Sequence, residues 1–175
     1  MNIQKISSLL FATTLMLGAS SANAQLSKAE IVATGLTCSM CSNSINKQLK
    51  SLSQVDSVAT DLNTNTFTVY LKKDNDLSPR ILKENVEKAG FFVGSMVVTL
   101  PFDNLKIEDN LAVKKDNLAL VFVDARPKVL NGSTRIKIQD KGFVTQKQYK
   151  KLAKSYSKYP TYSFENEDDY HVKAL

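Results

Sequence analysis

The chain has 175 residues, of which 43% are hydrophobic and 23% are charged, and its formal net charge is +6. This composition excludes a disordered chain and allows one or two globular domains. The excess of positive charge is an ordinary feature of solubility, and we expect no nucleic-acid partner from it.

Residues 1–24 are predicted to be a secretory signal peptide. Lys5 is the only charge in this segment, the run 9–17 is almost wholly apolar, and small residues with an A-x-A pattern precede Gln25. The apolar run is too short to span a membrane. We therefore expect an exported mature protein, periplasmic or secreted, that is soluble after cleavage and has no transmembrane segment.

The two cysteines of the chain, Cys38 and Cys41, form a C-x-x-C motif at the connection between a predicted strand at 29–34 and a predicted helix at 42–52. We expect Cys38 to lie in the loop and Cys41 in the first helical turn. A helix N-terminus favours an anion, so a thiol there loses its proton readily. Thiolates bind soft metals and also attack disulfides. A loop so short gains little from a structural disulfide. The motif therefore predicts metal binding or thiol–disulfide chemistry.

Two more strands, a helix and a last strand are predicted to follow this first strand–helix pair. The strands are expected at 56–62 and 66–71, the second with clear alternation of apolar residues. The helix begins with Ser78 as its N-cap and ends at Gly90, and an apolar strand covers 91–100. The order βαββαβ predicts a ferredoxin-like α+β domain over 28–100.

A second, small α+β domain of unknown role is predicted for 101–175, with the boundary at Pro101. It contains no cysteine and carries a net charge of +4, against +1 for 25–100. Most of the excess lies on a predicted helix whose lysines we expect to form a solvated face, partly balanced by the acidic run 165–169. The predicted elements are a strand at 117–125, a turn at Asn131-Gly132, a strand at 134–139, a helix from the capping box at Thr145 to about 159, and a closing strand pair at 162–164 and 170–172.

The segment Gly35-Leu36-Thr37-Cys38-Ser39-Met40-Cys41 is similar to the GMTCxxC loop of the heavy-metal-associated domain family. That family includes copper chaperones, the metal-binding repeats of P-type ATPases and periplasmic mercury-binding proteins, and it has the ferredoxin-like fold. The resemblance covers 28–100 and implies that Cys38 and Cys41 are the metal-ligating thiolates. It departs at Leu36, where the family usually has Met, a nearly volume-conserving change. Phe91 resembles the position that shields the metal loop, although Phe91 and Phe92 also fit a plain core.

Two thiolates without a nearby histidine or carboxylate favour Cu(I) or Hg(II), whereas Zn(II) needs further donors. Met40 occupies a position that varies in the family and points away from the metal. We expect a metal-binding protein or metallochaperone, not an enzyme, that holds one ion between Cys38 and Cys41 and passes it to a partner with cysteine ligands. Two alternatives remain open: a thiol–disulfide redox protein using the same pair, and a partner-binding module with a vestigial metal site.

The other reactive side chains do not form a recognisable catalytic group. His171 is the only histidine of the chain, and we expect it to be structural. The tyrosines of the last third of the sequence, Tyr149, Tyr156, Tyr159, Tyr162 and Tyr170, are predicted to pack in a core.

Overall fold

The computed structural model describes residues 25–37, 39–115, 117–163 and 169–175, so the predicted signal peptide lies outside the described residues. The described elements, in chain order, are β1 (Lys28–Thr34), α1 (Ser39–Lys50), β2 (Val55–Asp61), β3 (Thr66–Leu71), α2 (Pro79–Lys88), β4 (Phe92–Ile107), β5 (Ala112–Lys115), β6 (Leu118–Phe122), β7 (Lys128–Ile138), α3 (Gln146–Ser155), the 3₁₀ helix η1 (Pro160–Ser163) and β8 (Asp169–Ala174). The fold class is α+β, as predicted.

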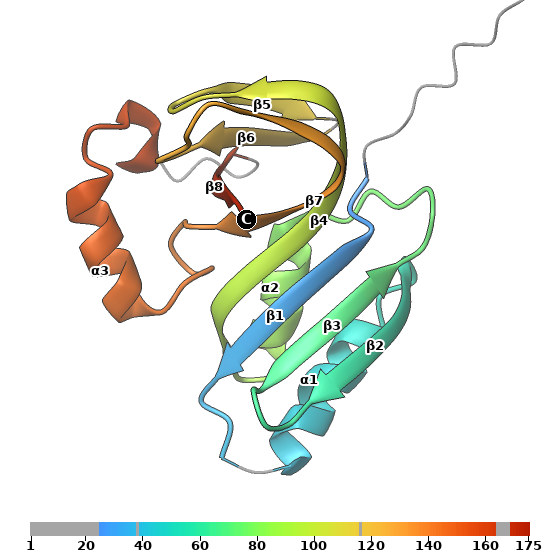
Figure 1. The fold of residues 1–175 in the computed structure, drawn as a ribbon. Helices are drawn as coiled ribbons and strands as arrows, with labels where there is room; N and C mark the ends of the chain where they lie inside the picture. Colours follow the sequence, from blue (N-terminus) through green and yellow to red (C-terminus); the bar gives the residue numbers. More distant parts are fainter. Residues whose placement is uncertain (1–24, 38, 116, 164–168) are drawn as a thin grey trace, which may run out of the picture.

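The strands form one sheet with the order β2-β3-β1-β4-β7-β8-β6-β5. The first four of these strands pair antiparallel, and together with α1 and α2 they make the βαββαβ ferredoxin-like unit. Figure 1 shows α1 and α2 on one face of this unit, with the loop between β1 and α1 at one end of it. The predicted N-terminal fold is confirmed.

Local sequence signals explain why α2 begins and ends where it does. The Ser78 hydroxyl accepts a hydrogen bond from the Ile81 N–H at 3.5 Å, and Pro79 follows at the first helical position, where no N–H is needed. Gly90 comes after the helix with a φ of +88°, a backbone conformation that glycine adopts without strain. The predicted cap, proline and terminal glycine are confirmed.

Strand β4 is longer than the predicted strand at 91–100, because β7 continues to pair with it as far as Ile107. The predicted boundary residue, Pro101, is exposed and lies inside β4 opposite Ser133. A single cluster of buried apolar side chains also joins the two halves of the chain, and it includes Ile31 and Phe122. The division into 28–100 and 101–175 stays a prediction.

The turn predicted at Asn131-Gly132 is wrong, because both residues lie within β7. Phe102 pairs with Gly132 and Leu105 pairs with Leu130, so β4 has one more residue than β7 between these pairs. Gly132 has a φ of +71° opposite this bulge. The glycine allows an irregular pairing in a continuous strand instead of reversing the chain.

The predicted closing pair of strands is half wrong. Residues Pro160–Ser163 form the 3₁₀ helix η1 instead of a strand, while the second member of the pair is β8. Tyr156, Tyr159 and Tyr162 are three residues apart, the spacing that brings side chains together in a 3₁₀ turn. The ring of Tyr156 packs against the rings of the other two. Strand β8 lies inside the sheet, antiparallel to β7 and parallel to β6.

Helix α3 packs against buried side chains of the C-terminal part through Tyr149, Leu152 and Ala153. Its capping box is confirmed, with the Thr145 hydroxyl accepting from the Gln148 N–H at 3.2 Å, but the helix ends at Ser155 instead of near 159. After α3, Tyr156, Tyr159 and Tyr162 form a small second core with Val121 and Val123. The prediction that these tyrosines serve packing is confirmed.

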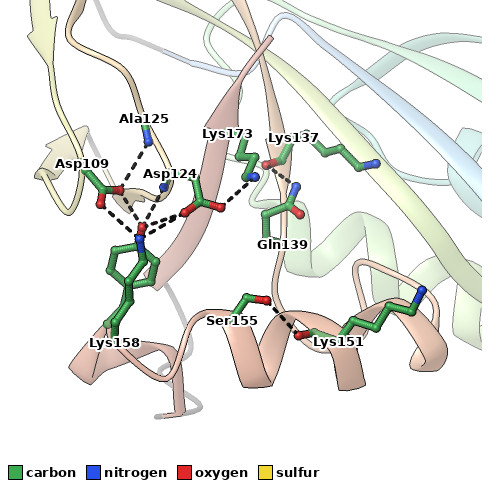
Figure 2. Close-up of polar contacts among 10 residues, drawn as sticks. Asp109, Asp124, Ala125, Lys137, Gln139, Lys151, Ser155, Lys158 and Lys173 are labelled. Carbon is green, nitrogen blue, oxygen red and sulfur yellow. Dashed lines mark hydrogen bonds and ion pairs between the residues drawn. The ribbon is translucent and has the colours of Figure 1, made fainter.

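A polar network fixes the chain just after α3 (Figure 2). The Tyr159 hydroxyl donates to Asp109 at 2.6 Å, and Lys158 lies 3.4 Å from Asp109 and 3.2 Å from Asp124. Lys173 approaches Asp124 from β8 at 3.0 Å. Although burial opposes it, hydrogen bonding from Lys173 and Lys158 lowers the pKa of Asp124 to about 2. Lys158 is therefore balanced by these aspartates, while most of the acidic run 165–169 lies outside the described residues.

Candidate metal centre

The candidate metal loop connects β1 to α1. Gly35 follows β1 with a φ of +87°, which turns the chain out of the strand. Cys41 is the third residue of α1, so it lies in the first helical turn as predicted, and it is half-buried. Cys38 lies outside the described residues. The geometry that can be described is therefore that of one cysteine and of the loop that leads to it.

The setting of Cys41 favours a negative charge. The first helical turn has N–H groups without partners inside the helix, and the positive end of the helix dipole lies there. The first turn of α1 contains no acidic side chain, whereas Lys47 and Lys50 stand in the last turn. A thiolate at Cys41 is therefore stabilised by the positive end of the helix dipole, and no carboxylate in the first turn of α1 repels it.

The side chains around the loop differ strongly in exposure. Phe91 is half-buried against the core, and its ring lies beside Gly35, where a Cβ would be 3.9 Å from Phe91 Cδ1. This contact agrees with a shielding role for Phe91. Phe92 is 68% exposed and Met40 is 80% exposed, so the interpretation of Phe92 as core is wrong.

The end of β1 is held close to β4 by a glycine. A Cβ at Gly94 would lie 2.5 Å from Thr34 Cγ2, so a larger residue would push this methyl group away, and 3.6 Å from Thr145 Cγ2, an ordinary van der Waals contact. The Thr34 hydroxyl also donates to the Phe92 carbonyl at 3.3 Å. Gly94 thus brings the strand that leads to the metal loop, β4 and the start of α3 together at one place.

Residues 31–92 match the model of the family described as the heavy-metal-associated domain. This segment is a heavy-metal-associated domain. It contains the metal loop, α1 and α2, and it ends at the first residue of β4, so 101–175 lie outside the match. Among the curated proteins compared, none matches the chain significantly.

Solved structures similar to the chain include several heavy-metal-associated domains. The yeast copper transporter domain Ccc2a, solved in its apo and Cu(I)-loaded states, is 36% identical over 37% of this chain and 86% of that chain, with a TM-score of 0.34. The N-terminal domain of a potential copper-translocating P-type ATPase from Bacillus subtilis is 33% identical over 38% and 82%, with a TM-score of 0.35. A copper-binding domain from the P-type ATPase HMA7 is 31% identical over 38% and 88%, with a TM-score of 0.35.

His171 lies outside the heavy-metal-associated domain and is occupied by structural contacts. Its Nδ1 is 2.8 Å from Asp140 Oδ1, its Nε2 is 2.8 Å from Thr161 Oγ1, and its ring packs edge-on against Tyr162. The side chain is buried, so both ring nitrogens are used inside the protein. The prediction that this histidine is structural is confirmed.

The described part of the chain brings no other metal-ligating group together. Among these residues, no three side chains of His, Cys, Asp or Glu converge as a metal site. In the same residues, no helix is both long and apolar enough to cross a bilayer. A feature that the sequence did not reveal is a groove where Phe92 faces α3. The single glycine at 94, inside an apolar strand, was the signal for this close approach.

Proposed function

We propose that Cys38 and Cys41 bind one Cu(I) ion as thiolates and that the chain carries this ion to or from a partner. The observation that carries the proposal is the position of Cys41, in the first turn of the helix that follows β1 of a heavy-metal-associated domain. A helix N-terminus stabilises the thiolate that a soft metal requires. Cys38 supplies the second sulfur from the loop.

The choice of Cu(I) follows from the ligands that this part of the chain offers. Two thiolates satisfy a soft ion that accepts low coordination, whereas Zn(II) prefers four ligands and would need outside donors. Hg(II) shares the preference for sulfur and is the other candidate ion. The yeast and Bacillus subtilis domains named above are both described in Cu(I)-loaded states.

Two sulfur ligands leave the ion open on one side. A cysteine of a partner can therefore bind the ion before Cys38 or Cys41 dissociates from it. The ion then passes to the partner by ligand exchange without entering water. The chain is also similar to the solution structure of the Atx1-Cu(I)-Ccc2a complex. A carrier of this kind is a binding protein and needs no catalytic group.

The predicted signal peptide supports export of this carrier, and an exported location makes the oxidation state of the cysteines important. In an oxidising compartment Cys38 and Cys41 can form a disulfide, and copper loading then requires prior reduction. The position of Cys41 at a helix N-terminus suits thiol–disulfide chemistry as well. The redox function is therefore the second candidate.

The test is to purify the mature protein from its native compartment and to measure its metal content and thiol state together. Copper bound at one ion per chain, with the two thiols protected from alkylation until the copper is removed, supports the carrier. A metal-free disulfide that turns over with a reductant supports the redox protein instead. A chain with two reduced thiols that takes up no Cu(I) contradicts both and indicates a vestigial site.

A further inference from the structure

A groove with a volume of about 740 Å³ separates the metal-loop end of the sheet from α3. One wall is made by Thr34 at the end of β1 and by Phe92 and Val93 at the start of β4, and the other by Val144 and Tyr149. Figure 1 shows α3 beside β4, on the side away from β1. The groove therefore lies between the heavy-metal-associated domain and the C-terminal part, next to the strand that leads to the cysteines.

The groove is mainly apolar, and part of its apolar wall is exposed. Phe92 presents 68% of its surface to solvent, although it begins a strand whose next residue, Val93, is buried. Met40, in the first turn of α1, is a further exposed apolar side chain at this end of the molecule. Exposed apolar surface around a hollow is typical of a binding site, and a volume of this size holds several side chains of a ligand.

The edge of the groove is positively charged. Lys150 lines it, and Lys147 is exposed one turn before Lys150 on α3. Among the described residues that line the groove, the only acidic side chain is Glu87, which pairs with Lys83 at 3.0 Å and is neutralised by it. An occupant with negative charge beside its apolar part would therefore match both the wall and the edge.

We propose that this groove docks the copper partner, through a segment of the partner that carries an apolar anchor flanked by Asp or Glu residues. The proposal rests on the function proposed above and assigns a task to residues 101–175, which would supply the lysines and one wall. A partner bound here lies beside the metal loop, so its cysteines come within reach of the ion. A protein segment fits better than a lipid surface because the apolar groups line a hollow, into which single side chains can insert.

The test measures docking without copper. The full mature chain is titrated with two short fluorescein-labelled peptides that share a Leu-Phe-Leu centre, one flanked by Asp and Glu and the other by Lys. The variants are Phe92→Ser, which removes the apolar wall, and the pair Lys147→Gln and Lys150→Gln, which removes charge from exposed positions. The matched controls are Leu62→Ser, an exposed apolar residue after β2, and the pair Lys73→Gln and Lys106→Gln.

The acidic peptide is expected to bind more tightly than the basic one, and more weakly as salt is raised. Replacing Lys147 and Lys150 should weaken binding by about threefold to tenfold, because each exposed charge contact contributes modestly. Phe92→Ser should weaken it by about tenfold. The control variants should bind like the parent.

The proposal is overturned if neither peptide binds, if both bind equally, or if the groove variants and the controls behave alike. Binding of the chain to anionic vesicles with loss in the lysine pair, but without binding of the acidic peptide, would assign the surface to a membrane and also overturn it. Copper affinity is measured separately on the same variants. If the peptides do not dock but Cu(I) still binds, the docking proposal fails and the proposed function stands. If the acidic peptide docks but Cu(I) does not bind, the proposed function fails and the docking surface stands.

Discussion

Replacing Phe122 by Ala tests whether the heavy-metal-associated domain and the C-terminal part of the chain are one cooperative unit. Phe122 lies in β6, is fully buried, and its ring packs edge-on against Phe102 with centroids 6.4 Å apart. It belongs to the same apolar cluster as Ile31 and Phe67 of the heavy-metal-associated domain. A cavity at Phe122 should therefore lower the stability of both halves of the sheet.

The size of the effect follows from the burial of the ring. Truncation of a fully buried Phe costs about 3–5 kcal/mol, a large fraction of the stability of an ordinary domain. For a chain of this size, about 2–4 °C is lost for each kcal/mol, so the unfolding temperature should fall by about 10 °C. Phe122→Leu keeps most of the buried apolar surface but loses the ring contact, so it should lower the unfolding temperature by a smaller amount.

The assay is hydrogen exchange followed by mass spectrometry, which reports the two halves separately. If the sheet unfolds as one unit, peptides from β1 and β3 should lose protection together with peptides from β6 and β8. The reasoning is refuted if Phe122→Ala lowers protection only after residue 107 and leaves 28–71 as stable as in the parent. In that case the predicted division at 101 describes two units that unfold independently.

Three smaller predictions concern charge and capping. Asp124 has a folded pKa of about 2, below the value near 4 of an unfolded chain, so its carboxylate stabilises the fold above pH 4 and this contribution is lost as the pH falls through 2. Because the side chain is 39% exposed, Asp124→Asn should cost only about 0.5–1 kcal/mol in urea unfolding at pH 7, and a difference from the parent that persists undiminished at pH 2 would contradict this assignment. Changing Lys150 and Lys154 to Gln should alter the free energy of unfolding by only a few tenths of a kcal/mol and leave copper uptake unchanged, since both side chains are exposed. Ser78→Ala should cost about 1 kcal/mol because the first turn of α2 loses its cap, whereas an unchanged midpoint in urea would show that the cap is dispensable.

The N-terminal fold could be predicted because its signals are local. Strand alternation at Phe67 and Val69, the cap at Ser78 and the glycine at 90 each act within a few residues, and together they specify the order βαββαβ. The position of Cys41 in the first turn of α1 followed from the same pattern, although that helix begins at Ser39, three residues earlier than predicted.

The C-terminal part was harder to predict because its elements depend on distant partners. Asn131-Gly132 has the composition of a hairpin turn, but β4 supplies a bulge opposite Gly132 and the strand continues. Strand β8 inserts between β6 and β7, a parallel neighbour that no local pattern indicates. The groove was missed for the same reason, since Phe92 and Tyr149 line the same groove only through the packing of α3 beside β4.

The central claim, that Cys38 and Cys41 hold one Cu(I), is tested most directly by competition against a Cu(I) chelator under reducing conditions. Three variants are compared with the parent chain: Cys38→Ser, Cys41→Ser and Met40→Leu. The parent should bind one ion per chain. Each serine variant should lose Cu(I) to the chelator, because a soft thiolate is replaced by a hard hydroxyl. Met40→Leu should retain Cu(I) almost as well as the parent does. If both serine variants hold Cu(I) as tightly as the parent, the motif is not the metal site and the account of this protein as a copper carrier is contradicted.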